Sequence, residues 1–259
     1  MTQITHFPDF QTRLAQSPSD LIAAQELRYE VFVAELGASG AGVDHSARRE
    51  TDVYDPHFDH LMLWDMAAPE GPALVGVYRL LRCDQRHKVG QFYTASEYDL
   101  SPLETGGRRL LELGRSCIAA PYRRSAALYF LWSALADYID EFQIDILFGV
   151  ASFHGTDIAS LAPSLSLLHA RHLAPIEIRP RAVPHAFQPM DLIAPDQINR
   201  VQAMAQVPAL IKGYLKLGGM IGEGAYVDHA FNTTDVCIVM DTARINWEQA
   251  RLFTQRRLE

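Results

Sequence analysis

One segment gives the clearest structural signal in this chain of 259 residues: LLELGRSCIAAPYRRSAALYFLWSALADYIDEFQIDILFGVA, residues 110–151. Its first ten residues, 110–119, form an apolar run interrupted by two charges, which predicts a buried strand that Pro121 ends. Apolar residues at helical spacing then predict a helix that begins near Ser125. The near-continuous apolar run at 145–152 predicts a second strand, in a central sheet position. A strand, a sharp turn, a helix and a strand in this order indicate an α/β protein.

Further helices and strands are expected on both sides of this unit. Helices are predicted where apolar residues recur at helical spacing after N-cap chemistry, as in the segment SPSD at 17–20. A charged, glycine-rich loop at 37–59 is of the length that often carries function. The other expected elements are a helix at about 20–36, a hairpin of strands 59–66 and 73–82, helices at about 155–169 and 206–219, a strand at 234–241 and a terminal helix at 245–259.

Composition excludes several functional classes. The chain has 31 acidic and 23 basic residues and a net charge of −8, which makes a general nucleic-acid binder unlikely. The three cysteines lie far apart and the histidines lack ligand spacing, so we expect no disulfide framework and no metal. No run of about 18 apolar residues is present, so we expect a cytoplasmic protein that at most lies peripherally on a membrane.

The turn between the central strand and helix is a candidate anion site. Arg123, Arg124, Ser125 and Ala126 lie where the helix begins, and free backbone N–H groups at such a point attract anions. A pyrophosphate or the phosphate of phosphopantetheine would fit there. From this turn alone, an ordinary helix start with solvated arginines is an equally good interpretation.

The same turn resembles a known motif. Ile118, Pro121, Tyr122, Arg123 and Ala126 look like the acyl-donor-binding motif of the GNAT acyltransferases, an Arg/Gln-x-x-Gly/Ala turn. The resemblance implies a GNAT fold, a twisted mixed sheet flanked by helices. We therefore expect one domain over residues 1–259, with a C-terminal extension at about 173–259 that helps to close an acyl pocket.

Two more specific families share a wider pattern with this chain. The pattern of the N-acyl-homoserine-lactone synthases is reproduced in order by Arg28, Phe32, Asp52, Asp55, Arg79, Glu112 and Arg115. The tryptophan that those synthases carry shortly after the phenylalanine is missing here. The closer resemblance is to the ornithine lipid acyltransferases, and it runs from about residue 25 to 242 through LRYEVFVAEL, RRETDVYDPHFDHLMLWD, LELGRSCIAAPYR and LIKGYLKLGGMIGEGAYVDHAFNTTDVCIVMD.

This resemblance implies an N-acyltransferase that moves a 3-hydroxyacyl chain from acyl carrier protein to the α-amine of ornithine. The implied partners are acyl carrier protein and ornithine. The acyl-phosphopantetheine carrier is then a co-substrate, and no resident cofactor is expected. One alternative is a synthase of N-acyl amino acids or N-acyl-homoserine lactones that uses another amine. Another is a non-catalytic module that binds acyl carrier protein.

Amide formation from a thioester needs a deprotonated amine and a polarised carbonyl held within reach of each other. Glu112 lies in an apolar strand, where burial would raise the pKa of a carboxyl group toward a useful value for a base. We expect Glu112 to be the general base, with Arg115 as a second catalytic residue. The alternative is a structural Glu112 paired with Arg115 or Arg79.

The remaining candidates bind the donor or the acceptor. Arginine forks suit the carboxylate of ornithine, and paired carboxylates suit its amines. For the arginine on the first helix the alternative is an exposed helix residue, and for the loop aspartates it is solubility or capping. The predicted acceptor-binding residues are Arg28 and Arg79 for the carboxylate, Asp52 and Asp55 for the amines, and Phe32 as a wall. The predicted donor-binding residues are Cys117, Ile118, Arg123, Arg124, Ser125 and Ala126.

An acidic carrier protein would have to dock on a locally basic face. Residues 108–124 contain five arginines and one glutamate and adjoin the proposed donor turn. The alternative is a solvated charged face, or one attracted to anionic lipid headgroups. Further basic residues that would extend this face are Arg171, Arg179, Arg181, Lys212 and Lys216.

Overall fold

The structure is a computed structural model that describes residues 4–123 and 125–245. These residues form two compact units. Residues 4–81 and 113–143 belong to unit 1, and residues 82–112 and 144–245 belong to unit 2. The expected single domain stays a prediction. The predicted terminal helix at 245–259 lies almost entirely outside the described residues, as does Arg124.

Unit 1 contains an antiparallel sheet built around the predicted hairpin. β4 (Asp59–Asp65) pairs with β5 (Ala73–Arg82) in an antiparallel register that shifts at Leu63. An unexpected strand, β1 (Phe10–Leu14), pairs antiparallel with the other edge of β4. The C-terminal part of β7 (Leu110–Ile118) follows β5 in the strand order. The hairpin and the central strand are therefore confirmed.

The first helix of unit 1 changes its geometry half way. α1 (Pro18–Arg28) begins after the N-cap Ser17, whose hydroxyl accepts a hydrogen bond from the Asp20 N–H, as the sequence predicted. It continues directly as the π-helix η1 (Tyr29–Glu35). The predicted helix is confirmed in extent. Its π-helical second half, a rare geometry that is frequent at functional sites, was not predicted.

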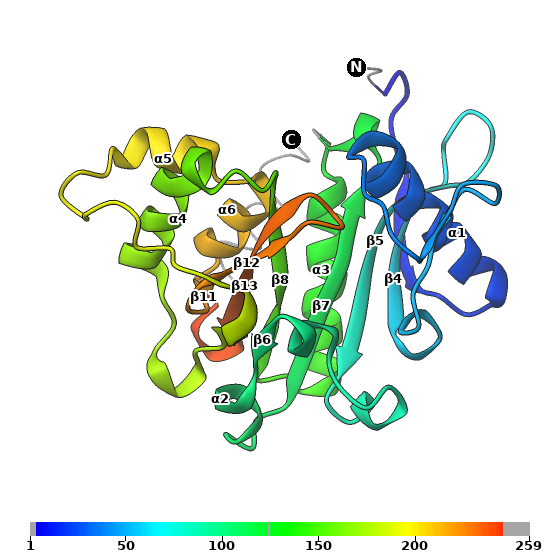
Figure 1. The fold of residues 1–259 in the computed structure, drawn as a ribbon. Coiled ribbons are helices and arrows are strands. Elements are labelled where there is room, and N and C mark those ends of the chain that lie inside the picture. Colours follow the sequence, from blue (N-terminus) through cyan, green and yellow to red (C-terminus); the bar gives the residue numbers. More distant parts are fainter. Residues whose placement is uncertain (1–3, 124, 246–259) are drawn as a thin grey trace. The chain divides into compact units, whose positions relative to one another are not determined.

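Two helices cover opposite faces of the unit 1 sheet (Figure 1). On one face, Ala24 and Leu27 of α1 share a buried cluster with Met62 of β4. On the other face, the Cβ position of Gly76 in β5 lies 2.9 Å from Leu131 Cδ1 of α3 (Ala127–Phe142) and 3.4 Å from Leu63 Cβ. Met62 and Leu63 are neighbours, and successive strand residues point to opposite faces. Unit 1 is therefore a sheet between two helical layers.

The predicted loop between α1 and β4 is more ordered than expected. It contains the short hairpin of β2 (Val43–Asp44) and β3 (Arg49–Glu50) and the 3₁₀ turn η2 (Asp55–His57). The Thr51 N–H donates to the Gly42 carbonyl at 2.8 Å and extends the hairpin. These bonds fix the polar side chains that follow β3.

The sheet of unit 2 is mixed. The N-terminal residues of β7 pair in parallel with β8 (Ile146–His154), from Leu110↔Ile146 to Glu112↔Phe148. β13 (Thr233–Asp241) lies antiparallel to β8 along its whole length. The other strands of the unit are β6 (Tyr98–Asp99), β9 (Arg181–Ala182), β10 (Phe187–Gln188), β11 (Met220–Ile221) and β12 (Ala225–Asp228).

Three longer helices of unit 2 follow β8 (Figure 1). α4 (Ile158–His172) begins at the N-cap Asp157 and continues through Pro163. The Ser164 hydroxyl donates to the Ala203 carbonyl at 2.8 Å and joins α4 to α5. The other helical segments are α2 (Ser101–Glu104), α5 (Arg200–Gln206), α6 (Ala209–Lys216) and the 3₁₀ turns η3 (Arg86–Lys88), η4 (Tyr93–Ser96), η6 (Ile176–Ile178), η7 (Pro184–Ala186) and η8 (Thr242–Arg244), with η5 (Ala120–Tyr122) in unit 1.

The predicted α/β fold class is confirmed by this arrangement of mixed strands and helices. Across residues 4–123 and 125–245, the structure contains no helix with both the length and the apolar character needed to cross a bilayer.

Candidate active site

Glu112 is held firmly in unit 2. Its side chain lies on β7 and is 1% exposed. The Tyr93 N–H donates to Oε2 at 2.9 Å and the Thr94 N–H donates to Oε1 at 2.6 Å. Both donors come from the start of η4, a turn that the sequence did not predict. These two hydrogen bonds hold both oxygens of the Glu112 carboxylate in one orientation.

The charged residues that the sequence predicted to bind the acceptor form one network of ion pairs in unit 1, together with the predicted catalytic Arg115 and with Glu50, which was not predicted. We call it the arginine–carboxylate network, and its members are Arg28, Glu50, Asp52, Asp55, Arg79 and Arg115. Arg28 at the end of α1 lies at its centre. Its Nε donates to Glu50 Oε2 at 2.6 Å, and its Nη1 and Nη2 donate to the two oxygens of Asp55 at 2.8 and 2.7 Å. Nη2 also donates to the Glu50 carbonyl at 2.5 Å.

Arg28 is completely buried, so the alternative of an exposed helix residue is wrong. Burial alone would lower the pKa of Arg28, but the charges of Glu50 and Asp55 outweigh it and the pKa is raised. Burial would likewise raise the pKa of Asp55, yet the hydrogen bonds and charges of Arg28 and Arg79 lower it overall. Arg28 and Asp55 therefore both carry their charge at neutral pH.

The second arginine of the network joins the loop to the sheet. Arg79 on β5 donates from Nη1 to Asp52 Oδ2 at 2.6 Å and to Asp55 Oδ1 at 2.9 Å. Its guanidinium carbon lies 4.6 Å from the ring centroid of Phe58, a cation–π contact. Asp52 also caps the following turn by accepting the Tyr54 N–H at 2.9 Å. The capping role that the sequence left open for Asp52 therefore coexists with an ion pair.

Two members of the network are less buried than the others. The side chain of Asp52 is 18% exposed and that of Arg115 is 13% exposed, whereas those of Arg28, Glu50, Asp55 and Arg79 are at most 2% exposed. Arg115 Nε donates to Glu50 Oε1 at 3.2 Å. Its backbone φ is +48°, a left-handed conformation that is rare for a non-glycine residue in a strand. A polar ligand that enters from solvent would meet Asp52 and Arg115 first.

The side chain of Phe32 packs against apolar residues and not against the arginine–carboxylate network. It lies on η1, is partly buried and packs against the apolar cluster that contains Val31, Val77 and Cys117. This contact favours a wall or core role over a polar one.

The donor turn is stabilised by its own hydrogen bonds. The Ser125 N–H donates to the Tyr122 carbonyl at 3.1 Å, and the Ala127 N–H donates to Ser125 Oγ at 3.1 Å. Ala126 is the N-cap of α3 and supplies no side-chain cap. Two amides near the predicted anion site thus already have partners inside the turn.

Arg123 is paired in the same way. Its Nη1 and Nη2 donate to the two oxygens of Glu35 at 2.6 Å each, and its Nε donates to the Ile118 carbonyl at 3.0 Å. The hydrogen bond from Arg123 lowers the pKa of Glu35. An anion that binds to Arg123 would therefore have to compete with Glu35.

Cys117 is a buried thiol of unit 1. Burial raises its pKa to about 12, so the thiol stays protonated at neutral pH. A protonated thiol is a poor nucleophile, which argues against an acylated cysteine intermediate. Cys117 packs in the buried cluster with Val31 and Met62, and its donor-binding role stays a prediction.

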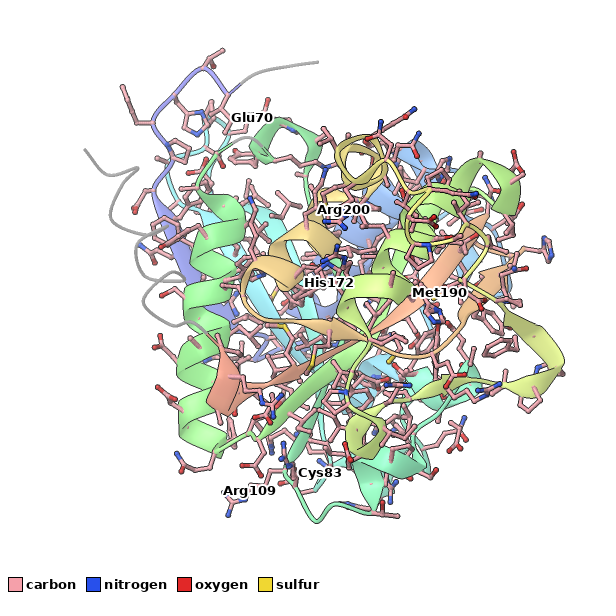
Figure 2. The ribbon with its side chains drawn as sticks, turned by 90° about the vertical axis from the view of Figure 1, so that its left-hand side faces the viewer. Glu70, Cys83, Arg109, His172, Met190 and Arg200 are labelled. Atoms are coloured by element: carbon pink, nitrogen blue, oxygen red, sulfur yellow. The ribbon has the colours of Figure 1, made fainter. Side chains whose placement is uncertain are left out.

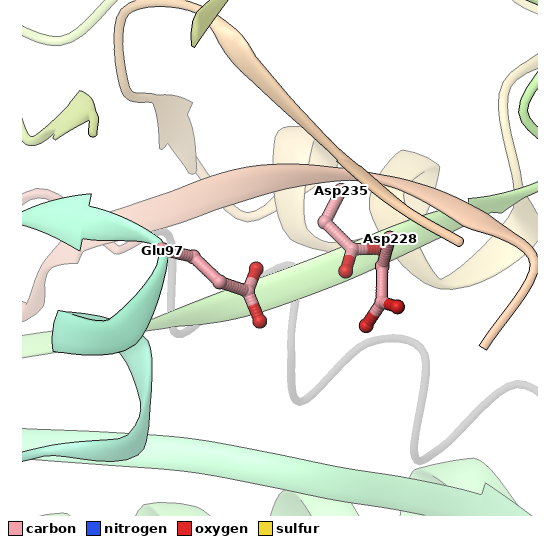
Figure 3. Close-up of side chains that lie close together, drawn as sticks. All are labelled: Glu97, Asp228 and Asp235. Atoms are coloured by element: carbon pink, nitrogen blue, oxygen red, sulfur yellow. The ribbon is translucent and has the colours of Figure 1, made fainter. Parts of the chain in front are cut away.

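Unit 2 contains a cluster of three carboxylates that was not predicted from the sequence (Figure 3). Single ligand atoms of Glu97, Asp228 and Asp235 lie within 4.8 Å of one another, and Glu97 and Asp235 are almost fully buried. Burial and these carboxylates raise the pKa of Tyr226. The expected absence of a metal stays a prediction. Binding of a cation to this cluster would contradict it.

The sequence contained a weak signal for part of this cluster and for Glu50. The strands 225–228 and 233–241 pair as a hairpin with Tyr226↔Asp235, which places Asp228 and Asp235 near each other on one face. The aspartate inside the apolar run of 233–241 could have shown that this face is polar. Glu50 could have been found because a buried Arg28 has five N–H donors, more than one aspartate can satisfy.

Comparison with known proteins gives the chain a family. A GNAT acetyltransferase-domain model matches residues 27–133. An L-ornithine N(alpha)-acyltransferase of Rhodobacter capsulatus is 52% identical over 252 residues, which cover 96% of each chain. An N-acyl amino acid synthase from uncultured soil microbes shares the fold, with a TM-score of 0.52, 14% identity and coverage of 96% of this chain and 99% of that one.

A CoA-dependent acyl-homoserine lactone synthase shares the fold as well, with a TM-score of 0.50, 13% identity and coverage of 93% and 94% of the two chains. The GNAT fold and the family resemblance predicted from the sequence are thus confirmed. This chain is an acyltransferase and belongs to the L-ornithine N(alpha)-acyltransferase family.

Proposed function

We propose that this chain transfers an acyl group, a 3-hydroxyacyl chain in our prediction, from the thioester of acyl carrier protein to the α-amine of ornithine. The observation that carries the proposal is the 52% identity, over 96% of both chains, to an L-ornithine N(alpha)-acyltransferase. The carrier protein as donor and the residue roles given below are parts of the proposal.

In the proposed reaction the α-amine nitrogen attacks the thioester carbonyl carbon. A C–N bond forms, the C–S bond breaks and the phosphopantetheine thiol leaves. The amine loses a proton to Glu112, directly or through a water molecule, and the leaving sulfur takes up a proton. Two backbone donors, Tyr93 N–H and Thr94 N–H, hold the Glu112 carboxylate in one orientation and support this role.

We assign the first polar contacts of ornithine to Arg115 and Asp52. Arg115 suits the carboxylate of ornithine, and Asp52 suits an ammonium group. Their greater exposure within the arginine–carboxylate network supports this assignment. Arg28 supports it as a positioning residue, because its Nε, Nη1 and Nη2 all donate to Glu50 or Asp55. Arg79 holds Asp52 and Asp55 in the same way.

The test is mass spectrometry of the products formed from 3-hydroxyacyl carrier protein and a mixture of amino acids. The expected product has the mass of N-acyl ornithine. Acylation of a different amine would overturn the acceptor assignment and leave an acyltransferase of another specificity. Binding of the carrier protein without any product would favour the non-catalytic module.

Glu112→Gln tests the base. We expect kcat to fall by roughly 10²- to 10⁴-fold, because the amide accepts no proton from the amine. Glu177→Gln is the matched control, since Glu177 is an exposed residue of η6 in the same unit. Circular dichroism and unfolding in urea would establish that both variants fold. Turnover of Glu112→Gln at the rate of the control would remove Glu112 from the mechanism.

A further inference from the structure

Unit 2 contains a shallow cavity, wide open to solvent, that the proposed reaction does not use. Its volume is about 730 Å³, within the range of small-molecule sites, and it lies between α4, α5 and α6. Half of its eight lining residues are basic: Arg171 and His172 at the end of α4, Arg200 at the start of α5 and Lys212 of α6. Figure 2 shows Arg200 and His172 in this region. No acidic residue lines the cavity.

The basic side chains of the cavity differ from most other arginines of the protein. Arg28, Arg79, Arg115 and Arg123 are all paired with carboxylates. Within the described part of the chain, no carboxylate forms a salt bridge with the basic residues that line the cavity. The Lys212 ammonium instead donates to the Ala205 carbonyl at 3.2 Å.

The pKa of His172 reflects the positive charge beside it. Partial burial and the nearby charge of Arg171 lower the pKa of its imidazole. The charged groups that line the cavity on the other two helices are Arg200 of α5 and Lys212 of α6, both basic. Positive charge that the protein does not neutralise, in a chain with a net charge of −8, indicates that an anion is the missing partner.

The remaining lining is apolar. Leu167, Met204 and Ala205 contribute apolar surface to the cavity. Val201 stands beside them with 84% of its surface exposed. Exposed apolar side chains next to unneutralised basic ones are typical of surfaces that contact the interface of an anionic membrane.

We propose that this cavity binds the phosphate headgroup of an anionic phospholipid and so brings unit 2 to a membrane surface. Arginine forks match phosphate oxygens, and Val201 would rest among the first methylene groups of the lipid. The proposed product, an ornithine with a long acyl chain, would itself partition into a bilayer, and only this last point rests on the proposed function.

The first experiment measures sedimentation of the full chain with phosphatidylcholine vesicles, with and without phosphatidylglycerol. We expect binding only when phosphatidylglycerol is present. Arg200→Gln should weaken it about fivefold and Arg171→Gln/Arg200→Gln by roughly the square of that factor. The matched control is Arg109→Gln, an exposed arginine of unit 2 that belongs to the basic segment 108–124 and does not line the cavity (Figure 2). Equal losses of vesicle binding in Arg200→Gln and in the control Arg109→Gln would overturn the proposal.

A second experiment follows the His172 ring by NMR during titration with dihexanoyl phosphatidylglycerol below its micelle concentration, and with inorganic phosphate. Bound phosphate would raise the pKa of His172 toward or above its usual value. A rise with the lipid and none with inorganic phosphate at equal concentration supports a lipid site. A rise with inorganic phosphate alone would overturn the lipid assignment, and so would the absence of any shift.

The carrier protein is the competing partner. If Arg200→Gln weakened binding of the acyl carrier protein and left vesicle binding unchanged, the cavity would be a protein-docking site and the proposal would fail. Acylation of ornithine in the absence of vesicles should be unaffected by Arg200→Gln. Vesicle binding and acylation of ornithine are thus measured separately, so failure of the membrane proposal can be distinguished from failure of the proposed reaction.

Discussion

Arg28 shows how a single buried charge organises the loop that follows it. Its guanidinium spans Glu50 and Asp55, which lie 22 and 27 residues further along the chain. The loop side chains are therefore positioned by a residue of the preceding helix. Removal of Arg28 would leave two carboxylates without their principal countercharge in the interior.

Arg28→Ala should lower the free energy of unfolding by about 3–5 kcal/mol, because it uncovers buried like charges. The measurement is urea unfolding followed by circular dichroism. The matched control is Glu30→Gln, which removes an ion pair to Arg48 whose side chains are 50% and 59% exposed and should cost less than about 1 kcal/mol. Equal losses in the two variants would contradict the central role of Arg28.

All residues of the network except Glu50 could be predicted individually, but their arrangement could not. The pattern of Arg28, Asp52, Asp55, Arg79 and Arg115 was readable from a family resemblance. Their mutual pairing depends on a π-helical turn and on a loop hairpin, and neither leaves a periodic signal in sequence. The sequence pattern therefore predicted Arg28 and Arg79 as ligands of ornithine, whereas the geometry favours them as supports for Asp52 and Asp55.

Elements could be predicted where the hydrophobic period was strong. The hairpin of β4 and β5, the strand β7 and the helix α3 all combine long apolar patterns with clear turn residues. β1 was missed because its five residues, FQTRL, alternate too briefly to stand out from a loop. The short strands between residues 181 and 228 were missed for the same reason, since tertiary contacts rather than local patterns specify them.

The contact between β5 and α3 gives a prediction for these elements. Gly76→Val should destabilise the protein by about 1–3 kcal/mol, because its Cβ would lie 2.9 Å from Leu131 Cδ1 and its methyl groups would meet Leu63 and Ile118. Urea unfolding measures the effect. In Gly106→Val, the control, the Cβ meets no atom closer than 3.7 Å and the change should stay within about 0.5 kcal/mol.

A double variant tests the cause. Leu131→Ala makes room for the valine, so Gly76→Val should cost less in that background than in the wild type. Strict additivity of the two losses would show that the destabilisation arises elsewhere than at this contact.

At the scale of the whole molecule, ion pairs set the response to acid. The hydrogen bond from Arg13 lowers the pKa of Asp20, and that from Arg123 lowers the pKa of Glu35. At Asp55 and Asp65, burial raises the pKa but hydrogen bonds outweigh it, from Arg28 and from His6 respectively. Each of these groups ionises more readily in the folded chain than in the unfolded one.

The stability that these four carboxyl groups contribute should therefore be fully present above their unfolded pKa values, about 4. It should be lost as the pH falls through their lower folded pKa values. The urea midpoint should fall modestly below about pH 6.5, because the pKa values of His60 and His172 are lower in the folded chain than in the unfolded one, and should decrease steeply below about 4 as these carboxyl groups are protonated. High salt should weaken the contributions of the exposed pair Arg123–Glu35 more than that of buried Asp55. An unchanged midpoint between neutral and strongly acidic pH would contradict the assignment.

The two-unit organisation and the basic cavity of unit 2 were not accessible from sequence. The cavity combines residues from positions 167 to 212, in a stretch where prolines and short elements hide any period. Its basic members Arg171 and Lys212 were noted as extensions of a docking face, yet which residues surround a hollow is decided by how three helices pack. The net charge gave no indication of it, since a sum over the chain hides local sign.

The placement of the cysteines gives each unit its own reporter. Cys117 is buried in unit 1 and Cys237 is buried in unit 2, while Cys83 is partly exposed. Burial raises the pKa of both shielded thiols, so a maleimide or iodoacetamide can react with them only when the surrounding structure opens. Pulse alkylation followed by peptide mass analysis would then measure the alkylation rates of Cys117 and Cys237 separately in one experiment. The thiol that is modified first marks the half of the protein that opens more often.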